Sequence, residues 1–124
     1  MAAKFNDVQK IKDMFESQGG NAEIPLLRGN RTFSAEVVNG GINVSNLGNQ
    51  PYLSWEVFEE AVKLLKEQGG RVVRGNAMKN KLGEPSLPLN SLEGHIANKV
   101  YGKQIGDSVF RCITPVDCIL VWAG

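Results

Sequence analysis

The chain has 124 residues, which fits one domain, and its 42% hydrophobic and 22% charged residues exclude an intrinsically disordered protein. No run approaches the roughly 18 to 20 consecutive apolar residues of a membrane-spanning helix, and the first residues lack the apolar stretch of a secretory signal. We therefore expect a cytoplasmic protein without a membrane partner. The net charge of +1 is unevenly distributed, with −3 over residues 1–60 and +4 over residues 61–124.

Residues 5–18 are predicted to form an N-terminal helix. The apolar side chains recur at the spacing of one helix face, at Phe5, Val8, Ile11, Met14 and Phe15. Gly19 and Gly20 follow, and glycine is the residue that most readily adopts the left-handed conformation in which helices commonly end.

A β section is predicted over residues 24–47. Residues 32–38 and 42–47 alternate between apolar and polar side chains. The Asn-Gly-Gly sequence at residues 39–41 suits the tight turn of a hairpin, because asparagine and glycine tolerate positive φ angles. A shorter strand at residues 24–27 is expected at an edge of the sheet, because Pro25 has no backbone N–H to donate to a neighbour.

The strongest helical pattern covers residues 54–68, with Ser54 as the expected N-cap. Glutamates lie near its start and lysines near its end, which suits the helix dipole. Its apolar side chains form a broad stripe, which predicts the main helix of the core: Trp55, Val57, Phe58, Ala61, Val62, Leu64 and Leu65.

Residues 75–90 contain two glycines and two prolines and are predicted to form a long irregular loop. A C-terminal helical group is expected to follow, with helices from residue 90 or 91 to 101, at 107–113, and from Thr114-Pro115 to about residue 122. Strands at 108–113 and 118–122 remain the alternative, because both segments contain β-branched residues.

Together these elements predict one α+β domain that spans residues 1–124. Its small antiparallel sheet, the hairpin at about 32–47, is expected to pack against the amphipathic helix at about 54–68. The N-terminal helix and the C-terminal helical group surround this core.

No catalytic motif can be identified. His95 is the only histidine, so neither a Ser-His-Asp nor a Cys-His arrangement is supported. Cys112 and Cys118 lie among apolar residues and are expected to be buried free thiols rather than a disulfide or metal ligands. No phosphate-binding glycine motif is present. We therefore expect no metal site and no cofactor, and a protein that acts by binding.

Nucleic acid is the partner that the charge distribution favours. Residues 91–122 are compatible with consecutive short helices around a turn at 102–106, the arrangement of a helix-turn-helix protein. Solvated surface charges are the competing explanation, and the hypothesis requires the basic residues to share one face. Six basic residues are the candidate phosphate contacts: Arg71, Arg74, Lys79, Lys81, Lys103 and Arg111.

Two other functions remain open. The apolar segment at residues 119–124 has to be covered, which predicts either burial or self-association as a homo-oligomer. A small-ligand site is expected near the 75–90 loop if the protein binds such a ligand, because long loops in compact domains are often functional.

Three segments resemble small uncharacterised bacterial proteins of the mobile-element kind, those carried on phages and integron gene cassettes. They are the strand-like residues 41–47, the helix start at 53–58 and the segment 106–115. The resemblance covers less than half of the chain and implies a bacterial origin, but no activity.

Overall fold

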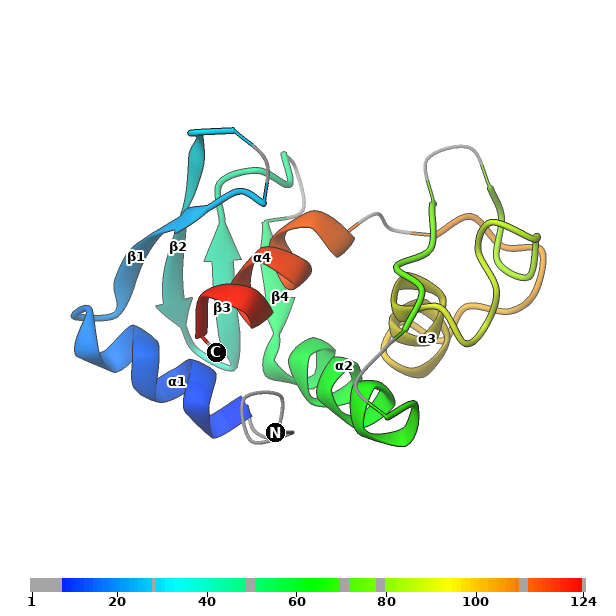
Figure 1. Cartoon of the computed structure of the whole chain (residues 1–124), viewed down its shortest axis with the longest axis horizontal. Coiled ribbons are helices and arrows are strands. Elements are labelled where there is room, and N and C mark those ends of the chain that lie inside the picture. The colour runs from blue at the N-terminus through cyan, green and yellow to red at the C-terminus, as the bar shows by residue number, and fades with distance from the viewer. Residues whose placement is uncertain are drawn as a thin grey trace.

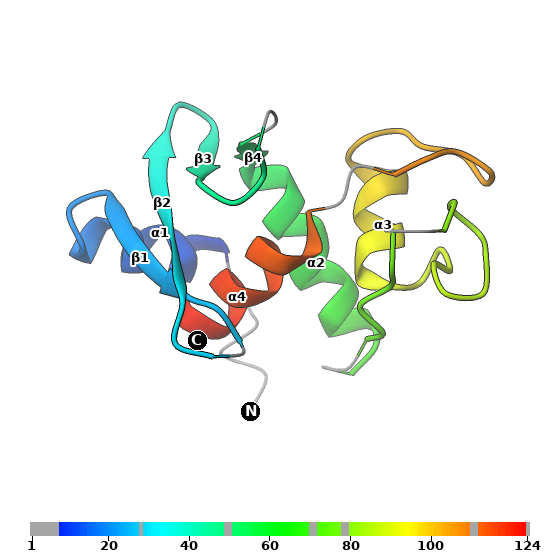
Figure 2. The same cartoon turned by 90° about the horizontal axis from the view of Figure 1, so that it is seen from above.

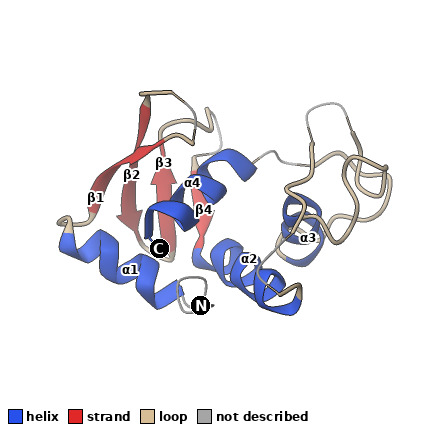
Figure 3. Ribbon diagram, in the orientation of Figure 1, coloured by secondary structure: helices blue, strands red, loops and turns tan. Residues whose placement is uncertain are grey.

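The computed structural model describes residues 8–27, 29–48, 51–69, 72–77, 80–109 and 112–123. They form an α+β fold of helices and one antiparallel sheet (Figure 1; Figure 3). In chain order the elements are α1 (Val8–Ser17), β1 (Asn21–Pro25), β2 (Thr32–Val38), β3 (Gly41–Val44), β4 (Tyr52–Ser54), α2 (Trp55–Glu67), α3 (Leu92–Lys99) and α4 (Ile113–Ala123).

The sheet has the order β1-β2-β3-β4, so each strand pairs with its neighbour in the chain. Its register places Ile24 opposite Phe33 and Ile42 opposite Leu53. These four side chains are buried and point to the same face, which packs against α1, α2 and α4. The opposite face carries mainly polar side chains that alternate with them along the strands.

Helix α4 fills the centre of the covered face (Figure 1). Its residues Val116 and Ile119 are fully buried, as is Phe58 of α2. The rings of Phe15 and Trp122 lie 4.9 Å apart between centroids, which joins α1 to the end of α4. The apolar C-terminal segment is therefore covered largely by the chain itself.

Helix α3 lies at one end of the molecule, beside α2 and away from β1 and β2 (Figure 2). We call residues 72–77 and 80–109, which comprise α3 and the irregular chain around it, the loop lobe. Every residue of α3 from Leu92 to Ala97 is buried. The helix is therefore an internal support of this lobe.

Backbone hydrogen bonds between loops give the loop lobe its structure. The start of α3 is bonded to the 72–77 segment, because Leu92 N donates to Val73 O at 2.7 Å. Further along, Leu82 N donates to Asp107 O at 3.0 Å and Gly106 N donates to Leu82 O at 2.8 Å. These bonds replace a regular strand or helix ladder.

Most predicted elements are confirmed. The hairpin is β2 and β3, the 54–68 helix is α2, and the 75–90 loop is irregular over its described residues. The N-terminal helix is α1 over the part that is described. The predicted strand at 24–27 is shifted to Asn21–Pro25, and it lies at the edge of the sheet, as Pro25 requires.

Strand β4 was not predicted, because its three residues directly precede a strong helical pattern. The prediction for the C-terminal helical group was partly wrong. Residues 107–109 and Cys112 are irregular, and α4 begins at Ile113, one residue before the expected Thr114 cap. The alternative strand at 118–122 is also wrong, since these residues are helical. None of the described helices is long and apolar enough to cross a membrane.

Truncation of Ile119 to alanine should lower the free energy of unfolding by about 2 to 5 kcal/mol, because it leaves a cavity at the centre of the covered sheet face. Chemical denaturation measures this change. Val121 of α4 is 63% exposed and is the matched control, so Val121→Ala should alter stability by no more than about 0.5 kcal/mol. Equal effects of the two substitutions would contradict the orientation of α4.

Candidate functional site

Glu93 is a charged side chain in the interior, with 1% of its surface exposed. One carboxylate oxygen accepts a hydrogen bond from Ala77 N at 3.2 Å. The other accepts from Cys112 N at 3.0 Å and from Ile113 N at 3.2 Å. These last two amides begin α4, where backbone donors have no partner inside the helix and a negative charge is favourable. Glu93 therefore caps α4 from a distant helix.

The residues before and after Glu93 are also committed to the fold. Ser91 Oγ donates to Pro88 O at 2.6 Å and accepts from Gly94 N at 3.0 Å, which caps α3. Pro88 O lies so close to Gly94 that a side chain at this position would collide with it. Gly75, with φ of +84°, lies against Ser91 and Leu87 and likewise has no room for a side chain.

His95 binds Glu60 of α2, with 2.9 Å between its Nε2 atom and the carboxylate Oε1 atom. The imidazole is 10% exposed and the carboxylate side chain 21%. This contact joins α3 to α2 across the boundary of the loop lobe. His95 is therefore a buried residue of α3, with 8% of its surface exposed.

The two cysteines are buried free thiols, as predicted. Burial, and then the nearby charge of Glu93, raises the pKa of Cys112 to about 12. Burial also raises the pKa of Cys118. Both thiols therefore remain protonated near neutral pH, and a protonated thiol is a poor nucleophile.

The side chains of Glu93 and His95 thus bond α3 to the 72–77 segment, to α2 and to the start of α4. Among the described residues, no group of three or more histidine, cysteine, aspartate or glutamate side chains is placed to hold a metal ion. Every buried side-chain nitrogen and oxygen in the described part of the chain has a hydrogen-bond partner.

The structure describes three of the six predicted phosphate contacts. Arg74 forms an ion pair with Asp117 of α4, and its side chain is 52% exposed. Lys81 is exposed and Lys103 is half-buried, and both lie in the loop lobe. The other three, Arg71, Lys79 and Arg111, lie outside the described residues. The described three therefore belong to one lobe, but whether all six share a face stays a prediction.

The helix-turn-helix hypothesis does not fit the described structure. Helix α3 is buried within the loop lobe, so it has no free face to insert into a major groove. The residues after the turn at 102–106 are irregular up to residue 109, and α4 directs its apolar side chains into the core. Any contact with nucleic acid in this region has to come from loops.

The charges of the chain are divided more sharply than the comparison of residues 1–60 with residues 61–124 indicates. Residues 71–111 carry seven basic and three acidic side chains, whereas the rest of the chain carries seven basic and ten acidic ones. One of the three acids is Glu93, whose charge is buried and bonded to backbone amides. The basic excess of the protein therefore coincides with the segment that contains the loop lobe. This basic excess can be found from the sequence alone, by counting the charges around the predicted loop at residues 75–90.

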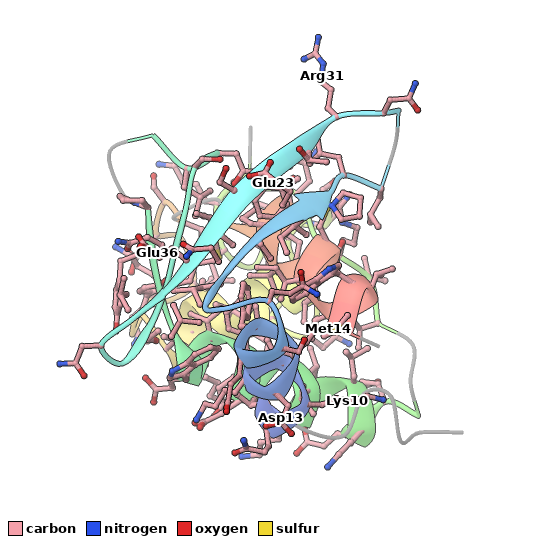
Figure 4. The ribbon with its side chains drawn as sticks, turned by 90° about the vertical axis from the view of Figure 1, so that its left-hand side faces the viewer. Lys10, Asp13, Met14, Glu23, Arg31 and Glu36 are labelled. Carbon is pink, nitrogen blue, oxygen red and sulfur yellow. The ribbon has the colours of Figure 1, made fainter. Side chains whose placement is uncertain are left out.

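The open face of the sheet has the opposite character. It forms a shallow hollow of about 730 Å³, and the residues known to line it include no lysine or arginine. Glu23 accepts hydrogen bonds from Ser34 Oγ at 2.6 Å and Thr32 Oγ1 at 2.9 Å, and these bonds lower the pKa of its carboxyl. In Figure 4, Glu23 and Glu36 lie on the strands, with Asp13 on α1 below them. This face is unsuited to a phosphate backbone.

Another hollow, of about 460 Å³, lies beside the start of α4 and is lined by Leu26, Leu47, Thr114 and Pro115, among others. Its helix terminus does not offer a free anion site, because Glu93 occupies the amides of Cys112 and Ile113. Neither hollow is lined by residues 75–90, so a ligand site near that loop stays a prediction.

No protein-family model, no curated protein and no solved structure matches this chain. The resemblance to mobile-element proteins stays a prediction. What the protein does therefore has to follow from its own residues.

Replacement of Glu93 by glutamine should lower the free energy of unfolding by about 2 to 4 kcal/mol, because the amide offers one acceptor oxygen and turns two new donors toward backbone N–H groups. Chemical denaturation near neutral pH measures the loss. Glu84→Gln, at an exposed loop position, is the matched control and should change little. Wild-type stability in Glu93→Gln would show that the buried carboxylate does not support α4.

Thiol labelling tests the burial of the cysteines. With a pKa of about 12, roughly one Cys112 side chain in ten thousand is a thiolate at pH 8, against about one in ten for a thiol at its usual value of 9.0. We expect iodoacetamide to leave both cysteines of the native protein unmodified and to alkylate both in denaturant. Rapid alkylation of native Cys112, located by peptide mass spectrometry, would contradict the predicted environment.

Proposed function

We propose that the protein is a non-enzymatic binding module whose partner is nucleic acid, with the loop lobe as the contact surface. The observation that carries this proposal is the coincidence of charge and structure. The segment 71–111 holds a charge of +4 while the remainder holds −3, and its described residues form a lobe of exposed loops. Basic side chains on exposed loops are suited to phosphate contacts.

The charges in the rest of the molecule also favour the loop lobe as the contact surface. The open sheet face carries Glu23 and Glu36, and α2 carries more glutamates than lysines. A polyanion would be repelled from these surfaces and drawn toward the loop lobe. Arg74 is oriented by Asp117 at the junction of the lobe with α4, where its side chain remains about half exposed.

Self-association is less well supported by the fold. The apolar side chains of α4 at Ile119, Leu120 and Ala123 are buried within the chain. In the same segment Trp122 is partly buried and Val121 is exposed. The need for a covering partner, which prompted this hypothesis, is thereby largely met. A homo-oligomer stays a prediction, which light scattering can test.

Binding to nucleic acid should weaken steeply with salt, with a log–log slope of about −0.7 to −0.9 for each phosphate neutralised. Replacement of Lys81 and Lys103 by alanine should lower the magnitude of this slope by about 1.5, because two cations are removed. Fluorescence anisotropy with labelled oligonucleotides of about 20 nucleotides, titrated from low to physiological salt, measures both quantities.

The matched control removes two exposed lysines elsewhere, Lys10 of α1 and Lys63 of α2. This variant has the same net charge as the Lys81/Lys103 variant and should keep the wild-type slope. Equal slopes for both variants would show that the loop lobe is not the contact surface. No binding of any oligonucleotide at low salt would refute the proposed function.

A further inference from the structure

The exposed loops of the lobe also indicate which form of nucleic acid would fit. We propose that the partner is single-stranded, and that the ring of Tyr101 provides the surface on which a base stacks. This inference rests on the proposed function and makes it more specific. It follows from three features of the loop lobe: the burial of α3, the position of Tyr101 between two lysines in the sequence, and the exposed side chain of Ile105 in the loop that follows.

The first feature concerns duplex recognition. Reading a duplex in its major groove requires an element that projects into the groove, usually a helix or a two-stranded ribbon. Helix α3 is buried from Leu92 to Ala97, and no strand is present in the described residues of the loop lobe. Single strands need no such element, because their bases are accessible to side chains on a surface.

The second feature is the sequence around Tyr101, directly after α3. Lys99 precedes it by two residues and Lys103 follows it by two, so in the sequence an aromatic residue lies between two cationic ones. Lys99 is exposed, and Tyr101 is 36% exposed. Alternation of basic and aromatic side chains is typical of surfaces that hold single strands, where lysines contact phosphates and rings stack on bases.

The third feature is Ile105, in the loop that follows Tyr101, whose side chain is 69% exposed. It adds exposed apolar surface to the loop that carries Tyr101, and apolar surface suits contact with unpaired bases. Burial, as the main cause, raises the pKa of Tyr101 to about 12, so its phenol is neutral at physiological pH.

The test compares a labelled oligothymidine of about 20 nucleotides with a duplex of equal length in the same buffer. The full-length protein should bind the single strand more tightly than the duplex. Tyr101→Leu keeps most of the buried volume but removes the aromatic face, and it should weaken binding of the single strand by about 5- to 150-fold. Tyr101→Phe keeps the ring and should bind within about twofold of wild type.

Val121→Ala, which removes exposed apolar surface from α4, is the control and should not alter the affinity. Salt-dependent binding with equal or greater affinity for the duplex would overturn this inference and leave the proposed function intact. A folded Tyr101→Leu variant that binds the single strand as tightly as the wild type does would also overturn this inference and leave the proposed function intact. If Tyr101→Leu does not fold, the preference of the wild-type protein for single strand over duplex decides the question. Absence of binding to either oligonucleotide would overturn both proposals.

Discussion

The carboxylate of Glu93 is the interaction on which the arrangement of the C-terminal half depends. It brings together the 72–77 segment, α3 and the first turn of α4 through three backbone amides. A buried charge without partners costs several kcal/mol or more, and so do buried amides without acceptors. Here the carboxylate accepts hydrogen bonds from the three amides, so neither the charge nor the amides lack a partner. The cap of α4 is therefore provided by a residue about twenty positions earlier in the chain, which couples the sheet-covering helix to the loop lobe.

This coupling explains how a lobe with one short helix can be ordered. Its loops bond to each other through the backbone of Leu82, Gly106 and Asp107, and to α3 through Val73 and Arg74. Close packing at Gly75 and Gly94 lets the loops approach the start of α3 without side chains between them. Because α3 is buried from Leu92 to Ala97, the side chains of the lobe that face solvent come mainly from the surrounding loops.

The sequence predicts those elements whose signal is local. Alternation and an Asn-Gly turn predicted the β2–β3 hairpin, and a broad apolar stripe predicted α2. What it could not predict depends on contacts between distant residues. The motif at Thr114-Pro115 resembled a helix start, whereas α4 begins earlier because Glu93 caps Ile113. The burial of Glu93 and His95 was equally invisible, since a short segment with mixed polar and apolar residues is usually half exposed.

The same reasoning applies to the candidate site. Basic residues and a run of short helical patterns suggested a recognition helix, yet the helix that forms is internal. The three candidate residues that the structure describes, Arg74, Lys81 and Lys103, lie on loops. A helix presents a fixed surface that matches a groove, whereas loops follow the shape of a flexible ligand. The division of charge between the acidic sheet face and the basic segment 71–111 then restricts where a polyanion can approach. Local sequence patterns therefore indicated the charge of the segment 71–111, while the burial of α3 depends on contacts between distant residues, which such patterns do not contain.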